Sequence, residues 1–181
     1  MATEGPTSEH ALRASRTYGA AADHYQRAAL SFWDRFGAAT VSRLRLAPGG
    51  TVLDLCCGAG ASALPAARAV GPHGHVLGID IAAPMLEEAR RRDPGSAYHL
   101  VQVGDLGALG DAQFDLVFAA FTFDNIPADA QKVASLTALH ARLAPHGRLQ
   151  IAFLQLAFEL ALVFDPDGIV PEVFNPLRPA V

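Results

Sequence analysis

A carboxylate followed by a glycine-rich stretch is the part of this chain whose residue types are best suited to chemistry. Asp54 lies within an apolar run, residues 52–57, and Gly58 and Gly60 follow it. Glycine permits positive φ angles and a close approach of the backbone to a ligand, so such a turn after a buried strand is typical of nucleotide-cofactor sites. The sequence therefore predicts a cofactor-binding turn here.

The charge of Asp54 bears on which cofactor the turn could bind. Residues 58–63 fit the dinucleotide pattern G-x-G-x-x-G/A, which places an anionic pyrophosphate at the N-terminus of the next helix. Asp54 would repel that pyrophosphate, whereas it would attract a cofactor that carries a cationic amino group and a sulfonium. S-adenosylmethionine carries both. The alternative role for Asp54 is a cap of the next helix.

Two further carboxylates follow the next two predicted strands. Asp80 ends the second strand and Asp105 lies just past the third. Since parallel strands bring their carboxyl ends to one edge of a sheet, we expect Asp54, Asp80 and Asp105 to line up there. Asp80 suits the hydroxyls of a ribose, and Asp105 can accept a hydrogen bond from an exocyclic amine such as that of adenine. Any one of them could be a turn residue, but three in register favour a binding site.

The elements that must position these residues alternate along the chain. Apolar segments predict strands, and the segments between them predict helices. The fold class is therefore α/β, a Rossmann-like doubly wound parallel sheet with helices on both faces. The predicted strands are residues 51–56, 75–80, 98–103, 114–119 and 148–153, and the predicted helices are residues 61–70, 84–92 and 129–143.

The chain is expected to form one domain with a covering region before it. A helical stripe of apolar and aromatic residues runs from Tyr18 to Phe36, so helices should cover part of the core. The expected regions are a flexible N-terminus (1–14), N-terminal covering helices (15–47), the cofactor-binding α/β core (48–155) and an irregular C-terminal segment (156–181).

The C-terminal segment is expected to leave the sheet curtailed after its fifth strand. Only 28 residues follow Phe153, and the prolines at 166, 171, 176 and 179 disfavour a paired hairpin. The fifth strand would then be an open edge, which proteins normally cover. The terminal segment could fold over it, a second copy could cover it in a homodimer, or the domain could end there.

Composition and charge exclude several classes of protein. A net charge of −4 and a pI near 5.9 argue against a dedicated nucleic-acid binder, and we interpret the arginines at 90–92 as a solvated helix end. Cys56 and Cys57 are adjacent and are expected to be small buried hydrophobes, with no metal site. Residues 149–164 are too short to span a membrane and the N-terminus lacks a signal-type core, so we expect a cytoplasmic protein.

In order and spacing, the motifs resemble those of the class I S-adenosylmethionine-dependent methyltransferases. Residues 52–60 resemble the family's first motif, 78–81 the second and 103–106 the third. Residues 114–118 and 143–149 resemble the fourth and fifth. The resemblance covers residues 15–155 as an ensemble.

The resemblance implies a binding role for individual residues. Asp54 and the turn would hold the methionine portion of the cofactor, Asp80 the ribose, and Asp105 with Leu106 the adenine. Cys56 stands where the family usually has a glycine, which is tolerable if that position does not need a positive φ. The full set of predicted cofactor-binding residues is Tyr18, Tyr25, Asp54, Cys56, Gly58, Gly60, Asp80, Ile81, Met85, Asp105, Leu106, Ala120 and Phe121.

Within that family the nearest resemblance is to small-molecule and quinone C-methyltransferases. It is carried by Cys-Cys-Gly at residues 56–58 and by residues 121–125. Asp124 and Asn125 are the candidate catalytic residues, and His24 is another candidate base. Asp124 stands where quinone methylases typically carry arginine, which puts a quinone acceptor in doubt, whereas Asn125 matches.

The resemblance leads us to expect in-line methyl transfer to a small organic acceptor. A non-catalytic S-adenosylmethionine-binding accessory protein and an NAD-linked dehydrogenase are the alternatives. Tyr18 and Tyr25 are expected to close over the cofactor. The aromatic residues Phe32, Trp33 and Phe36 are expected to pack inward.

Overall fold

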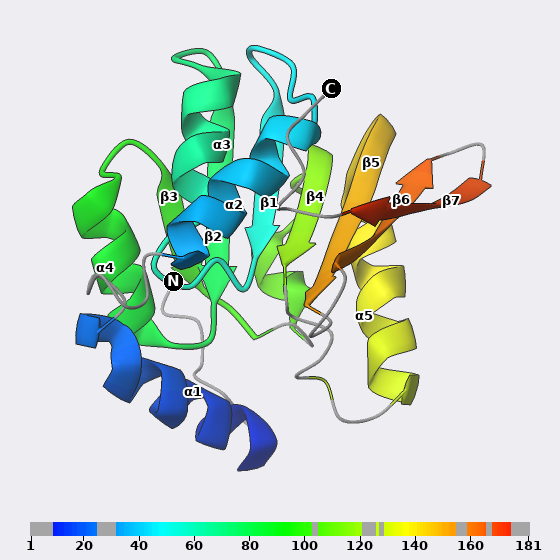
Figure 1. Ribbon diagram of the computed structural model, residues 1–181. Helices are drawn as coiled ribbons and strands as arrows, with labels where there is room; N and C mark the ends of the chain where they lie inside the picture. Colours follow the sequence, from blue (N-terminus) through cyan, green and yellow to red (C-terminus); the bar gives the residue numbers. More distant parts are fainter. Residues whose placement is uncertain are drawn as a thin grey trace.

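The computed structural model describes residues 9–24, 32–102, 105–120, 126, 129–154, 159–165 and 168–174. In this part of the chain, a seven-stranded sheet has the order β3-β2-β1-β4-β5-β6-β7 (Figure 1). The first five strands in that order pair in parallel, which confirms the predicted α/β sheet. The strands are β1 (Thr51–Leu55), β2 (His75–Asp80), β3 (Ala97–Leu100), β4 (Phe114–Ala120), β5 (Leu143–Leu154), β6 (Glu159–Asp165) and β7 (Gly168–Phe174).

Helices lie on both faces of the sheet, as expected. Apolar residues of α2, α3 and α4 form one core cluster with the sheet, and those of α5 and η3 form another on the opposite face. Figure 1 shows α5 apart from α2, α3 and α4 in the same way. The helices are α1 (Glu9–Ala21), η1 (Ala22–His24), α2 (Phe32–Arg43), α3 (Ala63–Val70), α4 (Ala83–Arg92), η3 (Leu106–Leu109) and α5 (Asp129–His140).

Strand β1 shows how the sheet divides its side chains between the two faces. Val52 belongs to the cluster under α2, α3 and α4, and Leu53 and Leu55 belong to the cluster under α5. Since successive side chains of a strand point to opposite faces, Asp54 lies on the side of Val52. The strand therefore directs this carboxylate toward α3.

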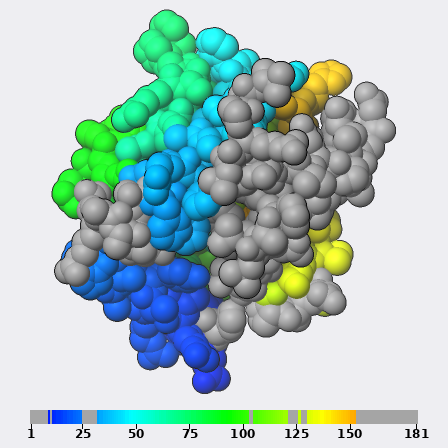
Figure 2. All heavy atoms as spheres, in the orientation of Figure 1, coloured from blue at the N-terminus to red at the C-terminus, as the bar shows by residue number. Residues whose placement is uncertain are grey.

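The N-terminal region consists of separate helices. Helix α1 begins at Glu9, earlier than the covering helices were expected to begin, and residues 25–31 between η1 and α2 lie outside the described residues. On the face drawn in Figure 2, α2 lies between α3 and α1. Phe32, Trp33 and Phe36 are only half-buried, and their rings contact one another, with centroids 4.8 Å apart for Phe32–Trp33 and 6.0 Å for Phe32–Phe36. This is less than the inward packing expected of them.

The expectation that the sheet ends after its fifth strand is wrong. Strand β6 pairs antiparallel with β5. Leu149 lies opposite Phe164 at one end of this ladder, and Leu154 lies opposite Glu159 at the other. Strand β7 pairs antiparallel with β6. Proline is tolerated in an outermost strand, where its missing N–H need not disrupt a ladder between two neighbours, and Pro171 lies in the outermost strand β7. Because β6 occupies the edge of β5, the reason for expecting a homodimer there is removed.

Candidate cofactor-binding site

The turn after β1 has the backbone conformation that the glycines predicted. Gly58 and Gly60 have φ angles of 53° and 85°, in the region that favours glycine. A Cβ at Gly58 would have no atom within 4 Å, so the turn is open at this point. A Cβ at Gly60 would lie 2.5 Å from a methyl carbon of Leu64, so close packing also requires glycine there. The turn thus offers exposed backbone on one side and is held tightly on the other.

Cys56 shares this conformation, although it is not a glycine. Its φ is 57°. We expected a cysteine to be tolerable here if the position does not need a positive φ, and this condition is not met. The side chain is half-buried, whereas the neighbouring Cys57 is buried as predicted, and burial raises the pKa of the Cys57 thiol. A strained residue therefore lies two positions before Gly58, where the turn is open.

Asp80 connects the end of β2 to this turn. Its Oδ2 accepts a hydrogen bond from the backbone N–H of Gly58 at 2.9 Å, and its Oδ1 accepts one from the N–H of Ala82 at 2.9 Å. The residue is only 7% exposed, and burial raises its pKa while these N–H groups act in the opposite direction. The end of β2 is thereby joined to the turn after β1 at the predicted edge.

Asp54 is more deeply buried and lacks one partner. It is 1% exposed, its Oδ2 accepts a hydrogen bond of 2.6 Å from the Ser62 hydroxyl, and its Oδ1 has no donor in the described part of the chain. Burial raises the pKa of Asp54 to about 7; the Ser62 hydrogen bond opposes this shift and the charge of Asp80 adds to it. This hydrogen bond comes from the hydroxyl of Ser62, the N-cap residue of α3. A helix cap, the alternative role, would instead accept from a backbone N–H.

Asp105 and Leu106 lie at the start of η3. Leu106 is buried in the core, whereas Asp105 is exposed and makes no side-chain cap hydrogen bond to η3. Arg142, before β5, donates hydrogen bonds to the carbonyl oxygens of Leu106 and Gly110, the latter just after η3. The structure therefore brings Asp54 and Asp80 together at the turn, while Asp105 remains at the surface.

Helix α1 packs against the same region. Met85, Ala59 and Ala82 belong to a small buried cluster, and Tyr18 of α1 packs against it half-buried. The Ser15 hydroxyl donates a 3.1 Å hydrogen bond to the carbonyl oxygen of Ile81, the next of the predicted site residues. These contacts bring Tyr18, Ile81 and Met85 close to the turn.

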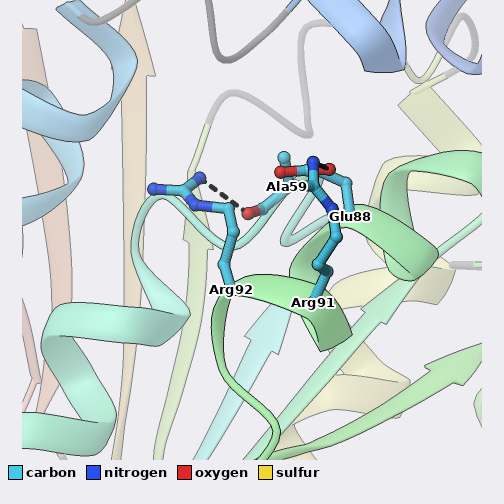
Figure 3. A network of polar contacts seen from close by, with 4 residues as sticks. All are labelled: Ala59, Glu88, Arg91 and Arg92. Atoms are coloured by element: carbon cyan, nitrogen blue, oxygen red, sulfur yellow. Dashed lines mark hydrogen bonds and ion pairs between the residues drawn. The ribbon is translucent and has the colours of Figure 1, made fainter.

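Two residues that the sequence analysis did not assign to the site also contact the turn. Arg92, at the end of α4, donates a 2.8 Å hydrogen bond to the carbonyl oxygen of Ala59 (Figure 3). Gly37 of α2 approaches so closely that a Cβ on it would lie 2.2 Å from the carbonyl oxygen of Ala61. The interpretation of residues 90–92 as a solvated helix end is wrong for Arg92. Arg90 is exposed, as that interpretation expects, although it also donates a hydrogen bond to the carbonyl oxygen of Tyr98.

The remaining predicted residues are described only in part. Ala120 ends β4, half-buried, and packs against the core. Tyr25, Phe121, Asp124 and Asn125 lie outside the described residues.

A comparison with protein families decides the family. A profile described as "Methyltransferase domain" matches residues 52–147, which contain β1, the turn, and the segments through the start of β5. The chain belongs to this methyltransferase family. The methyltransferase is also 31% identical over 176 residues to aklanonic acid methyltransferase DauC of Streptomyces sp. (strain C5), an alignment that covers 95% of this chain and 76% of the relative.

Other relatives of the methyltransferase are longer than this chain. It is 38% identical over 110 residues to a 2-phytyl-1,4-naphtoquinone methyltransferase of Nostoc sp., covering 58% of this chain and 46% of the relative. It is 39% identical over 109 residues to nocamycin O-methyltransferase of Saccharothrix syringae, covering 56% of this chain and 37% of the relative. The chain thus spans less than half the length of these two relatives.

Solved structures agree with the fold of the methyltransferase. Phosphoethanolamine N-methyltransferase 1 of Haemonchus contortus, in complex with phosphoethanolamine and S-adenosylhomocysteine, matches with a TM-score of 0.69 at 17% identity. The match covers 82% of this chain and 33% of that one. A methyltransferase from Aquifex aeolicus matches with a TM-score of 0.61 at 22% identity, covering 76% and 73%. At these identities the likeness concerns the fold.

The cofactor of the methyltransferase is S-adenosylmethionine, and the structure provides an independent test of whether the residues fit it. Asp54 has a buried oxygen that receives no hydrogen bond from the described residues, and a cationic amino group would satisfy it. Gly58 leaves open space where a ligand can approach the backbone. The residues therefore fit this cofactor. The family match and the named relatives favour neither the dehydrogenase nor the accessory protein.

The structure also has a surface hollow at the edge of the sheet where the parallel strands begin, opposite the edge that carries the turn. This hollow between α3 and α4 is lined by residues such as His75 and Ser96 at the amino ends of β2 and β3, and neither Asp54 nor Asp80 lines it. The described residues contain no cluster of three or more potential metal ligands. Nor does any helix among them have the length and apolarity needed to cross a bilayer.

Proposed function

We propose that this methyltransferase acts on a small organic acceptor, with organic acids and quinones as the first candidates. The relative that aligns along 95% of the chain is named for aklanonic acid, and another for a naphthoquinone. We expect the acceptor of this chain to belong to one of these two chemical classes.

The observation that carries the proposal is the unpartnered oxygen of Asp54 beside the open turn. S-adenosylmethionine, when bound, supplies a methyl carbon that its sulfonium has already activated. The chain therefore needs no fixed nucleophile, and its task is to bind and align the reactants, which can contribute up to about 7–11 kcal/mol. Asp54 would attract the amino group and Asp80 would hold the ribose, each through a buried carboxylate.

Methyl transfer from the cofactor to the acceptor needs no further reactant. Methyl transfer would break the bond between the methyl carbon and the sulfur of a bound cofactor, form a bond from that carbon to the acceptor's oxygen or carbon, and leave the electron pair on the sulfur of S-adenosylhomocysteine. The acceptor's proton goes to a base. We propose Asp124, with Asn125 beside it in sequence, for that role, and a positioned base contributes about 10²–10⁴-fold.

The test is turnover with a panel of organic acids, quinones and hydroquinones. S-adenosylhomocysteine release and the mass of the product are measured together, and fragment masses locate the new methyl group. A product heavier by one methylene unit supports the proposal. Binding of S-adenosylhomocysteine without turnover on any acceptor would instead support the accessory protein, and tight binding of NADH alone would contradict the site.

The role of Asp124 has its own test. Asp124→Ala should lower kcat by about 10²-fold with an active acceptor, while the affinity for S-adenosylhomocysteine stays unchanged. An unchanged kcat would exclude Asp124 as the base. Cytoplasmic localisation stays a prediction from the sequence, as does the absence of a nucleic-acid partner.

A further inference from the structure

Arg92 connects three segments that are far apart in the sequence. Its Nη1 donates to the carbonyl oxygen of Ala59 in the turn at 2.8 Å, and its Nη2 pairs with Oδ1 of Asp34 in α2 at 2.8 Å. Figure 3 shows Arg92 directed at Ala59, while the neighbouring Arg91 is directed at Glu88. One side chain of α4 thus holds both the turn and α2.

The hydrogen bond to Ala59 fixes a peptide unit of the turn. Arg92 holds its carbonyl, and the N–H of Gly60, at the other end of the same peptide, donates to the carbonyl oxygen of Cys57 at 2.9 Å. The preceding part of the turn is held by Asp80 through the N–H of Gly58. Without Arg92, the Ala59 carbonyl would lose its charged donor, and the peptide could rotate away from the conformation that leaves Gly58 open.

Helix α2 packs on the same turn by direct backbone contact. Gly37 faces the carbonyl of Ala61 with no room for a side chain, and Asp34 is three residues earlier, on the same face of the helix. The other end of this segment is held separately, because Arg148 donates a 2.7 Å hydrogen bond to the carbonyl oxygen of Leu44. The half of α2 near the turn is therefore held through the turn that Arg92 contacts and, more weakly, through the exposed ion pair of Arg92 with Asp34.

The shape of the side chain suits this double contact. A guanidinium presents a rigid fork of donors that can satisfy two acceptors at once, whereas the ammonium of lysine is a single point of charge. The Arg92 side chain is 20% exposed, but its partner Asp34 is 49% exposed, so the ion pair alone should contribute little. The hydrogen bond to the turn is the stronger of the two contacts because its acceptor belongs to the buried Ala59.

We propose that Arg92 is a positioning residue for the cofactor. It holds the Ala59–Gly60 peptide and the adjoining half of α2 in place, so that cofactor binding and packing of α2 on the turn depend on each other. This inference rests on the proposed function, since it requires that the turn binds S-adenosylmethionine or its product.

The experiment compares Arg92→Met with Arg91→Met. Both changes remove one positive charge from the last turn of α4, but the Arg91 side chain is 69% exposed and contacts only Glu88 among the hydrogen bonds and ion pairs described for it. Calorimetry with S-adenosylhomocysteine should show an affinity about 10-fold weaker for Arg92→Met and within about twofold of the unaltered protein for Arg91→Met. Arg92→Lys should fall between them, and Asp34→Asn should weaken binding by about twofold.

A second measurement separates positioning from stability alone. In the unaltered protein and in Arg91→Met, S-adenosylhomocysteine should slow amide hydrogen exchange in the first half of α2. In Arg92→Met this slowing should be lost, and exchange there should already be faster without ligand. If Arg92→Met does not fold, Arg92→Lys is compared in the same two assays.

The outcomes can be told apart. A lower melting temperature of Arg92→Met with unchanged affinity and unchanged slowing in α2 would overturn the inference, as would an equal loss of affinity in Arg91→Met. If the unaltered protein does not bind S-adenosylhomocysteine, the proposed function is contradicted instead. The ligand-free exchange rates then still decide whether Arg92 holds α2 in place.

Discussion

Asp54 should lose a proton when the cofactor binds. In the ligand-free protein, burial raises its pKa from 3.8 to about 7, so at pH 6 the side chain is mostly protonated. A cationic amino group at the unpartnered Oδ1 favours the carboxylate, and binding must therefore expel the proton. The affinity for S-adenosylhomocysteine should consequently fall as the pH decreases below 7.

The size of the effect follows from the same pKa. With a pKa of about 7, about half of the side chains are ionised at pH 7 and about one in a hundred at pH 5, so affinity at pH 5 should be about 50-fold weaker than at pH 7. At pH 6, binding should release about one proton per molecule. Asp54→Asn cannot release this proton, so its affinity should be weak and should vary far less between pH 5 and pH 7.

Stability should change in the opposite direction. The pKa of Asp54 in the folded state lies above its unfolded value, so the unfolded state binds fewer protons between about pH 4 and pH 7, and the free energy of unfolding falls as the pH rises through that range. The difference between a pKa of 3.8 and one of about 7 means that ionised Asp54 costs the folded state about 4 kcal/mol. Asp54→Asn removes this cost, but its buried amide without a partner costs about 1–3 kcal/mol. At pH 8 the ligand-free Asp54→Asn protein should therefore be more stable by about 1–3 kcal/mol.

The assay is calorimetric titration with S-adenosylhomocysteine at pH 5, 6 and 7 in buffers of different ionisation enthalpy, which reports the protons released. Ser62→Ala is the control, because losing its hydrogen bond removes an influence that lowers the pKa of Asp54 and should move the pH dependence to higher pH. Affinity that is constant between pH 5 and pH 7, with no proton released, would refute this reasoning. So would an unchanged pH dependence in Asp54→Asn.

Three other substitutions test the geometry of the turn. Cys56→Gly should raise the free energy of unfolding by about 0.5–1 kcal/mol in urea denaturation, because glycine adopts a φ of 57° without strain but loses more entropy on folding; a decrease would show that Cys56 is not strained. Gly37→Ala should lower thermal stability by about 1–3 kcal/mol, because its Cβ would lie 2.2 Å from the Ala61 carbonyl oxygen, and an unchanged melting temperature would contradict this contact. Asp80→Ala should weaken S-adenosylhomocysteine binding by about 1–3 kcal/mol in calorimetry, because the N–H of Gly58 loses its acceptor, and equal affinity would exclude Asp80 from the site.

The parts of the structure that follow from local rules could be predicted from the sequence. The five parallel strands were visible because strands buried on both faces are nearly continuous apolar segments. The positive φ angles of Gly58 and Gly60 follow from the residue type, and the place of Asp80 follows from parallel pairing of β1 and β2. Each of these inferences needs only a residue's own strand or turn, or the parallel pairing of successive strands.

The errors arose where the outcome depends on a distant partner. Arginines at the end of a helix are most often solvated, and Arg91 fits that expectation with a side chain that is 69% exposed. Arg92 differs only because Ala59 and Asp34, far away in the sequence, lie within its reach. Similarly, Pro171 argues against a strand between two others but is compatible with β7, because β7 is outermost. Sequence spacing carries no signal for either arrangement.

The turn combines two unfavourable features that should respond differently to substitution. Asp54 is desolvated, with one oxygen that has no partner in the part of the chain that the structure describes, and Cys56 has a φ that disfavours a side chain. Only the first contributes a charge that a cationic cofactor can use. Cys56→Gly should therefore stabilise the protein and leave cofactor affinity intact, whereas Asp54→Asn should stabilise it at pH 8 and weaken binding. This contrast would show that the buried carboxylate at this turn serves the ligand at the expense of the fold.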